Sequence, residues 1–229
     1  MHSLYKVSVI IPVLNEEDSI AAVLGDIPAE LKAEVLVVDN GCTDRTISIA
    51  CSMGAKIVVA RQRGYGAACF AGTQAAVGDI LVYLDGDYSD YPEEMTQLVV
   101  PIMAGQADLV LGSRLARGNF PREAMPFQQR FGNWLTARLM RWLYRISVTD
   151  LSPFRAIRKD TLLSLNMQEM TFGWPTEMMV KAARARLRLE EVPVHYRVRL
   201  GGKSKISGTL RGTILAGYYI LFTTFRYAF

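Results

Sequence analysis

The chain of 229 residues contains few of the residues that build disulfide frameworks or histidine metal sites, with three cysteines and two histidines. Cys42, Cys51 and Cys69 have neither paired nor metal-motif spacing, so we expect reduced thiols in a cytoplasmic protein. His2 and His195 are expected to be structural. No run reaches the roughly 20 apolar residues that a membrane-spanning helix needs. The first residues also lack a signal-peptide pattern, so no leader is expected.

Charge is present in both signs, but it is unevenly distributed along the chain. Residues 1–111 contain 6 Lys and Arg against 15 Asp and Glu, whereas residues 112–229 contain 20 against 7. This asymmetry favours an acidic half that takes cations and a basic half that meets anions. The alternative interpretation of any single charge is a solvated surface.

Short aliphatic and β-branched runs alternate with helix-like segments in the first half of the chain. The runs are apolar at successive positions, as in strands buried on both faces. The alternation predicts an α/β fold with a mainly parallel, doubly wound sheet and helices on both faces. The expected strands are 7–11, 35–38, 57–59, 80–84 and 109–111, and the expected helices are 19–27, 44–53, 65–77 and 92–103.

In the second half of the chain the regular alternation of expected strands and helices ends. Its tail carries no charge from residue 212 to residue 225 and is predicted to form an amphipathic helix over 209–229 that lies in a membrane interface. A core helix or an oligomer contact is the alternative. The other expected elements are a loop at 118–126, a long arginine-bearing helix at 127–144, strands at 154–157 and 192–196, and a helix at 177–185.

Polar residues follow four of the expected strands, where ligands of open parallel sheets bind. Asp39 follows the second strand and is an acceptor suited to a ribose hydroxyl or a base N–H. The first strand is followed by PVLNEE and not by G-x-G-x-x-G, which disfavours a nicotinamide dehydrogenase. Gly64 and Gly66 precede a helix, where they either bring backbone close to a ligand or form a tight loop.

The sequence YLDGDYSDYP ends an apolar run on two carboxylates. Asp85 and Asp87 fit either an Asp-Gly turn or a pair that holds a divalent cation. Carboxylates at i and i+2 reach one side if the chain turns at Gly86. Asp90 is interpreted as a loop and helix-start residue ahead of Pro92, not as a third ligand.

The ordered motifs IIPVLNEEDSI, VVDNGCTDRT, YLDGDYSDYPEEM, LGSR, DLSPFRAI and GGKSKISG resemble those of the family 2 glycosyltransferases, which have the GT-A fold. They are similar in particular to the polyprenyl-phosphate sugar transferases, such as dolichyl-phosphate mannosyltransferase. The resemblance implies a GT-A catalytic domain at 1–208, followed by the tail helix. Within it, 1–111 is the nucleotide-sugar half and 112–208 the acceptor half. It also implies inversion at the sugar carbon by direct attack.

The resemblance also implies roles for individual residues. Asp85 and Asp87 are expected to hold Mg²⁺ or Mn²⁺ on the donor diphosphate. Asp87, Arg114 and Glu177 are the expected catalytic residues, with Arg114 donating to phosphate oxygens. Glu177 acts as a base, orients the acceptor or pairs with a loop, and these alternatives stay open. The expected nucleotide-binding residues are Pro12, Leu14, Glu16, Asp39, Gly64 and Asp85.

The acceptor half is expected to bind an anion. Arg130, Lys203 and Lys205 are the expected ligands of the acceptor phosphate. Asp150 and Arg155 are expected to build the floor of the site through a mutual ion pair.

These residues predict a metal-dependent hexosyltransferase that moves glucose or mannose from a nucleotide-diphosphate sugar to a polyprenyl phosphate. The enzyme is expected to be cytoplasmic and peripheral at the inner face of the membrane. No nucleic-acid partner is expected, and a homo-oligomer is possible. Two alternatives remain: the same chemistry with a soluble acceptor, either a phosphorylated small molecule or a sugar, and a non-catalytic nucleotide-sugar-binding protein.

Overall fold

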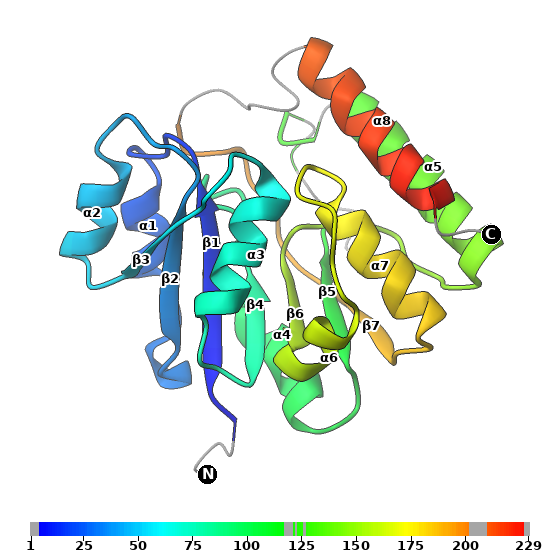
Figure 1. Cartoon of the computed structure of the whole chain (residues 1–229), viewed down its shortest axis with the longest axis horizontal. Helices are drawn as coiled ribbons and strands as arrows, with labels where there is room; N and C mark the ends of the chain where they lie inside the picture. The colour runs from blue at the N-terminus through cyan, green and yellow to red at the C-terminus, as the bar shows by residue number, and fades with distance from the viewer. Residues whose placement is uncertain (1–4, 117–120, 122, 126, 202–209, 227–229) are drawn as a thin grey trace.

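The computed structural model describes residues 5–116, 121, 123–125, 127–201 and 210–226. A seven-stranded sheet in the order β3-β2-β1-β4-β6-β5-β7 runs through the molecule, with helices on both faces (Figure 1). β6 is antiparallel to both of its neighbours, and the other strand pairs of the sheet are parallel. The predicted mainly parallel α/β sheet is therefore confirmed. The strands are β1 (Val7–Val13), β2 (Glu34–Asp39), β3 (Lys56–Val59), β4 (Ile80–Tyr83), β5 (Leu109–Ser113), β6 (Arg155–Arg158) and β7 (Leu189–Pro193).

The central strands are apolar throughout because each of their faces meets a separate layer of helices. On β1, Ile10 belongs to one core cluster, whereas Val9 and Ile11 belong to the other. The first cluster includes side chains of α3, α6 and α7, and the second includes side chains of α1, α2 and α4. The helices are α1 (Ile20–Gly25), α2 (Thr46–Ser52), α3 (Tyr65–Ala75), α4 (Met95–Met103), α5 (Phe127–Tyr144), α6 (Lys159–Ser164), α7 (Trp174–Arg184) and α8 (Leu210–Arg226), with short 3₁₀ turns η1 (Ala29–Leu31) and η2 (Pro92–Glu94).

Glycine allows α3 to lie close to the sheet. A Cβ atom on Gly72 would lie 2.4 Å from the Cγ2 of Ile10. Because two carbon atoms cannot approach that closely, any larger residue would move α3 away from β1. The contact at Gly72 therefore holds α3 against β1.

The chain after β5 contributes two further strands, β6 and β7, to the same sheet. β6 lies between β4 and β5, and β7 pairs with β5 from Leu109 opposite Leu189 to Ser113 opposite Pro193. The strand predicted at 192–196 is therefore wrong in its last three residues. Beyond Pro193 the chain leaves the sheet, and Tyr196 forms an isolated bridge with Asp90.

Three helices gather beside the β5–β7 side of the sheet. α5 has the predicted bounds, and it contacts both α7 and α8 (Figure 1). The tail does form a helix, α8, while its amphipathic character stays a prediction. Within the described residues, no helix has both the length and the apolar character to span a bilayer. Most of the loop predicted at 118–126 lies outside the described residues.

Candidate active site

Asp85 and Asp87 lie just beyond the carboxyl end of β4, in the centre of the sheet. Gly86 lets the turn between them lie close to β1, because a Cβ at this position would lie 2.8 Å from the Cγ1 of Val13. The Tyr65 hydroxyl at the start of α3 donates a hydrogen bond of 3.2 Å to Asp85 Oδ1. The turn therefore carries the carboxylate pair, and contacts with both β1 and α3 hold it in place.

The electrostatics of this pair favour a cation. Burial and the neighbouring charge of Asp87 raise the pKa of Asp85 to about 7. Carboxylate oxygens are the ligands that Mg²⁺ and Mn²⁺ prefer, so the donor set fits either ion. In the described part of the chain, no three Asp, Glu, His or Cys side chains converge on one metal position. Among the described residues, Asp85 and Asp87 are therefore the candidate ligands.

Arg199 supplies the pair with positive charge and was not predicted. Its Nη1 lies 3.6 Å from Asp87 Oδ2, and its Nη2 lies 2.8 Å from Glu16 Oε2. The segment 194–201 that carries it, which we call the strap, is held by the Leu200 N–H, which donates to the Asp87 carbonyl at 3.2 Å. Arg199 lies two residues before the start of the GGKSKISG motif, which was the one sequence signal that could have pointed to it.

The predicted nucleotide-binding residues of β1 and β2 meet at one edge of the sheet. Pro12 pairs with Val38 and precedes Leu14. Asp39 Oδ1 accepts the N–H groups of Gly41 at 2.9 Å and Cys42 at 2.7 Å, which folds the turn after β2. The Glu16 N–H donates to Thr46 Oγ1 at 2.8 Å. The structure brings these residues beside the carboxylate pair, while their contact with a nucleotide stays a prediction.

Gly64 and Gly66 are required by a loop of the protein itself. A Cβ on Gly64 would lie 2.2 Å from the carbonyl oxygen of Met170, and one on Gly66 would lie 2.4 Å from that of Glu169. The Gly66 N–H donates to the Thr171 carbonyl at 3.1 Å. These contacts account for both glycines as a tight loop, so nucleotide contact by Gly64 stays a prediction.

Glu177 holds that same loop. Its buried carboxylate on α7 accepts the N–H groups of Gln168 at 3.0 Å and Glu169 at 2.7 Å, and it pairs with Lys181 at 2.8 Å. Of the three roles left open by the sequence, these contacts favour loop pairing. Through the loop and Gly66, Glu177 supports the start of α3 and the hydroxyl of Tyr65.

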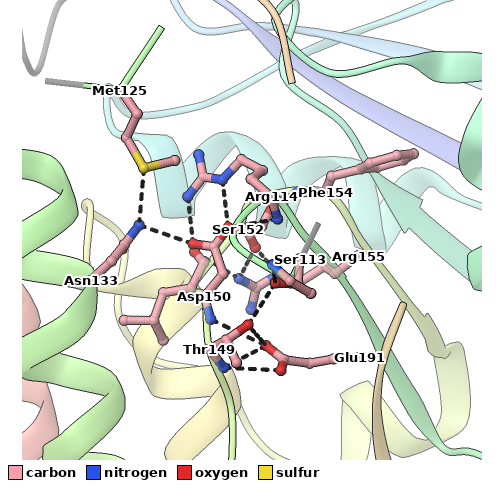
Figure 2. A network of polar contacts seen from close by, with 12 residues as sticks. Ser113, Arg114, Met125, Asn133, Thr149, Asp150, Ser152, Phe154, Arg155 and Glu191 are labelled. Atoms are coloured by element: carbon pink, nitrogen blue, oxygen red, sulfur yellow. Dashed lines mark hydrogen bonds and ion pairs between the residues drawn. The ribbon is translucent and has the colours of Figure 1, made fainter. Parts of the chain in front are cut away.

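Arg114 lies at the end of β5 in a satisfied network of polar contacts (Figure 2). Its Nε and Nη2 each lie 2.7 Å from an oxygen of Asp150, which also accepts the Arg114 N–H at 3.0 Å and Asn133 Nδ2 at 2.9 Å. The Glu191 carboxylate accepts the N–H groups of Thr149 and Asp150. We call these five residues the Arg114 network. The guanidinium face of Arg114 also lies 4.9 Å from the centre of the Tyr196 ring.

The predicted ion pair between Asp150 and Arg155 is wrong. Arg155 starts β6, and its guanidinium donates to the carbonyls of Ser152 at 3.1 Å and Pro175 at 3.0 Å. Burial lowers the pKa of Arg155 to about 10. Arg114 takes the carboxylate because the end of β5 lies next to the 149–150 segment.

The predicted acceptor-phosphate residues are only partly described. Arg130 is exposed on α5, one turn before Asn133. Lys203 and Lys205 lie outside the described residues.

Asp90 differs from its prediction as a helix-start residue. The first turn of η2 begins after Tyr91 and has no side-chain cap, and the Asp90 side chain is 1% exposed. We call Asp85, Asp87 and Asp90 the aspartate cluster.

Comparison with known proteins places this site in a family. Residues 8–164 match the description Glycosyl transferase family 2. An uncharacterized glycosyltransferase of Mycobacterium tuberculosis is 41% identical over 210 residues, which cover 92% of this chain and 94% of that protein. The dolichyl-phosphate hexose transferase of Haloferax volcanii is 34% identical over 197 residues, covering 85% and 84%.

A solved structure shares the fold. Glucosyl-3-phosphoglycerate synthase from Mycobacterium tuberculosis, in complex with Mn²⁺, uridine diphosphate and phosphoglyceric acid, superposes with a TM-score of 0.79. It is 24% identical and covers 98% of this chain and 79% of its own. The predicted GT-A fold is confirmed, and the chain is a member of glycosyltransferase family 2.

Proposed function

We propose that the chain is a metal-dependent inverting enzyme that moves a hexose, glucose or mannose, from a nucleotide-diphosphate sugar to a polyprenyl phosphate at the cytosolic face of a membrane. The observation that carries the proposal is the Asp85–Asp87 pair, whose two carboxylates end a buried strand and repel one another. Family membership supplies the reaction class.

The donor would bind at the carboxyl ends of β1, β2 and β4. Asp85 and Asp87 would hold Mg²⁺ or Mn²⁺, which when bound neutralises charge on the leaving nucleoside diphosphate. Mn²⁺ and uridine diphosphate in the glucosyl-3-phosphoglycerate synthase crystal support this cofactor and donor class. Glu16 and Asp39 are proposed to contact the nucleoside.

The acceptor in this proposal is already an anion. An oxygen of the polyprenyl phosphate forms a bond to the anomeric carbon while the bond from that carbon to the diphosphate oxygen breaks. The electron pair of the broken bond leaves with the nucleoside diphosphate. Because the attacking oxygen carries no proton, the site needs cationic guides more than a general base. Arg130 is the described candidate, and Lys203 and Lys205 are proposed beside it.

The surface of α5 and α8 supports a lipid acceptor. The rings of Phe127, Phe131 and Trp134 are half or more exposed along α5, and the guanidinium of Arg138 lies 5.9 Å from the centre of the Trp134 ring. Aromatic and arginine side chains together suit an anionic membrane interface. The dolichyl-phosphate hexose transferase of Haloferax volcanii supports the same acceptor class. The same helix α8 presents an open, mainly apolar surface formed by Tyr218, Leu221, Phe222, Phe225 and Arg226, which a polyprenyl chain could contact.

The direct test is transfer of radiolabelled hexose from UDP-glucose or GDP-mannose to undecaprenyl or dolichyl phosphate, with Mg²⁺ or Mn²⁺. We expect lipid-linked product with one donor and none with Asp87→Asn. Absence of transfer from any common donor would overturn the proposal. Donor binding without turnover would instead support the non-catalytic alternative.

A second candidate is the same reaction with a soluble phosphorylated acceptor, favoured by phosphoglyceric acid in the glucosyl-3-phosphoglycerate synthase crystal. Flotation with vesicles containing an anionic lipid separates the two candidates. The lipid-acceptor enzyme should float, and Trp134→Ser should weaken flotation. Val77→Ser, at an exposed position in the loop after α3, is the matched control and should have no effect. A protein that remains at the bottom while glycosylating 3-phosphoglycerate would establish the soluble acceptor.

A further inference from the structure

Asp90 carries a deeply buried carboxyl group. Its side chain is 1% exposed, and neither carboxyl oxygen has a hydrogen-bond partner among the described residues. Leaving such a group unpaired costs free energy, so buried polar groups are nearly always satisfied. An exception beside a catalytic site indicates a group whose partner arrives with the substrate.

Asp90 lies between the two charged regions of the site. Burial raises the pKa of Asp90, the charge of Asp85 adds to that effect, and Arg114 opposes it. Asp90 follows Asp87 by three residues, and its backbone bridges to Tyr196, whose ring centre lies 4.9 Å from the guanidinium of Arg114. Asp90 is thus close to the metal-binding pair and to the acceptor half at once.

The position of Asp90 places it where the transferred sugar is expected to bind. In the proposed reaction the diphosphate stays at Asp85 and Asp87, while the acceptor approaches from the half of the chain that contains Arg114. The hexose must therefore occupy the space between these groups, which is where Asp90 lies. Hydroxyl groups that donate to Asp90 favour its charged form, and the resulting carboxylate can receive hydrogen bonds from two neighbouring hydroxyls.

We propose that the Asp90 carboxylate accepts hydrogen bonds from hydroxyl groups of the donor hexose and so determines which sugar is transferred. The inference rests on the proposed function, since it requires a nucleotide-sugar donor. A role as third metal ligand is not favoured, because within the described residues no three such side chains converge.

The strap covers Asp90 and would have to move to admit a sugar. Tyr196 bridges to the Asp90 backbone, and the Arg197 N–H donates to the Ser89 carbonyl at 2.9 Å. The Arg197 guanidinium lies over the rings of Tyr88, at 3.3 Å, and Tyr91, at 4.0 Å. These are contacts of a single non-regular segment, not of a sheet or helix. Val194 at the start of the strap is buried in the core, whereas residues 195–201 are not, so displacing 195–201 exposes Asp90 without moving a core side chain.

The test compares nucleotide sugars with the corresponding nucleotides. Binding of UDP-glucose, GDP-mannose, UDP and GDP is measured by calorimetry with Mn²⁺ for wild type, Asp90→Leu and Asp90→Asn. We expect Asp90→Leu to lose about tenfold or more in affinity for the sugar nucleotide, as for a lost hydrogen bond to a charged group. Its affinity for the matching nucleoside diphosphate should stay within about twofold.

Stability distinguishes this role from a structural one. Asp90→Leu removes a buried carboxyl that has no hydrogen bond among the described residues, so its melting temperature without ligand should equal or exceed that of wild type. Asp90→Asn preserves the shape of the side chain and serves if the leucine does not fit. Asp87→Asn is the control, and it should lose affinity for nucleotide and sugar nucleotide alike.

Three results would overturn the inference. One is an equal loss of UDP and UDP-glucose affinity in the Asp90 variants, which indicates a metal or diphosphate role. Another is unchanged sugar-nucleotide affinity in both variants. In both cases wild-type transfer activity persists and the proposed function stands. Failure of the wild type to bind any of the four compounds would instead overturn the proposed function, and this inference with it.

Discussion

The aspartate cluster and the Arg114 network are neighbours, yet one is electrostatically incomplete and the other complete. In the cluster, Asp85 has a raised pKa and Asp90 has no hydrogen bond among the described residues. In the network, Asp150 receives four hydrogen bonds, two of them from the guanidinium of Arg114. A protein keeps buried carboxyl groups without partner charges or hydrogen bonds where a ligand provides these partners. We therefore interpret the aspartate cluster as a binding site and the Arg114 network as its scaffold.

The sharpest test of this comparison is Asp87→Asn. We expect transfer to fall by at least about 100-fold, because several kcal/mol of charge neutralisation in the transition state depend on the metal. Stability should change little, because the side chain is only partly buried and contributes little to the core. Radiolabelled transfer and urea denaturation provide the two readouts. Full activity would show that the metal assignment is wrong.

The network should respond in the opposite way. Arg114→Met leaves Asp150 charged and buried, so we expect a loss of about 3–5 kcal/mol in the free energy of unfolding. Arg158→Met is the matched control, since Arg158 pairs with Asp160 at the surface and its loss should cost no more than about 1 kcal/mol. Urea unfolding curves measure both. Equal effects in the two variants would remove the distinction between scaffold and site.

A pH series without metal probes the cluster directly. The pKa of Asp85 is raised from 3.8 to about 7, so the folded state binds more protons than the unfolded state between these values. Stability should therefore fall as pH rises from about 4 to 7 and then level off. Asp85→Asn should flatten this part of the melting-temperature profile, and Mn²⁺ should restore stability above pH 7. An identical profile for Asp85→Asn and wild type would contradict the assignment.

The smallest expected effect concerns Arg199, which lies where a cation would compete with it. We expect Arg199→Gln to bind Mn²⁺ about twofold to fivefold more tightly in the absence of nucleotide, consistent with a partly exposed ion pair of at most about 1 kcal/mol. Free Mn²⁺ is measured by electron paramagnetic resonance. Arg197→Gln, whose guanidinium lies on Tyr88 and Tyr91, is the control. Weaker Mn²⁺ binding by Arg199→Gln would show that the arginine is no competitor.

Local sequence predicted the sheet well because its strands carry their signal in consecutive apolar residues. The runs at 7–11 and 80–84 became β1 and β4 with small shifts at their ends. The prediction failed at 192–196, because strand pairing with β5 decides where β7 ends. The residues around Tyr196 in the sequence do not indicate that the chain turns there toward Asp90.

The site shows the same division between local and long-range information. The Asp85–Asp87 pair could be found from the sequence because both residues lie in one strand-end motif. The partner of Asp150 could not be found, since Arg114 and Arg155 are both basic residues and only the adjacency of β5 selects the first. Arg199 reaches Glu16 from 183 residues away.

By itself, the sequence determined the family, the order of the first strands and helices, and the pair of carboxylates proposed to bind a metal. Each depends on residue types that stand close together along the chain, so each can be recognised in the sequence. Only the tertiary structure decided that Glu177 holds a loop, that Gly64 and Gly66 make room for it, and that Asp90 is buried without a hydrogen bond among the described residues. Burial and ion-pair choice depend on chain segments that meet only after folding, so no local pattern encodes them.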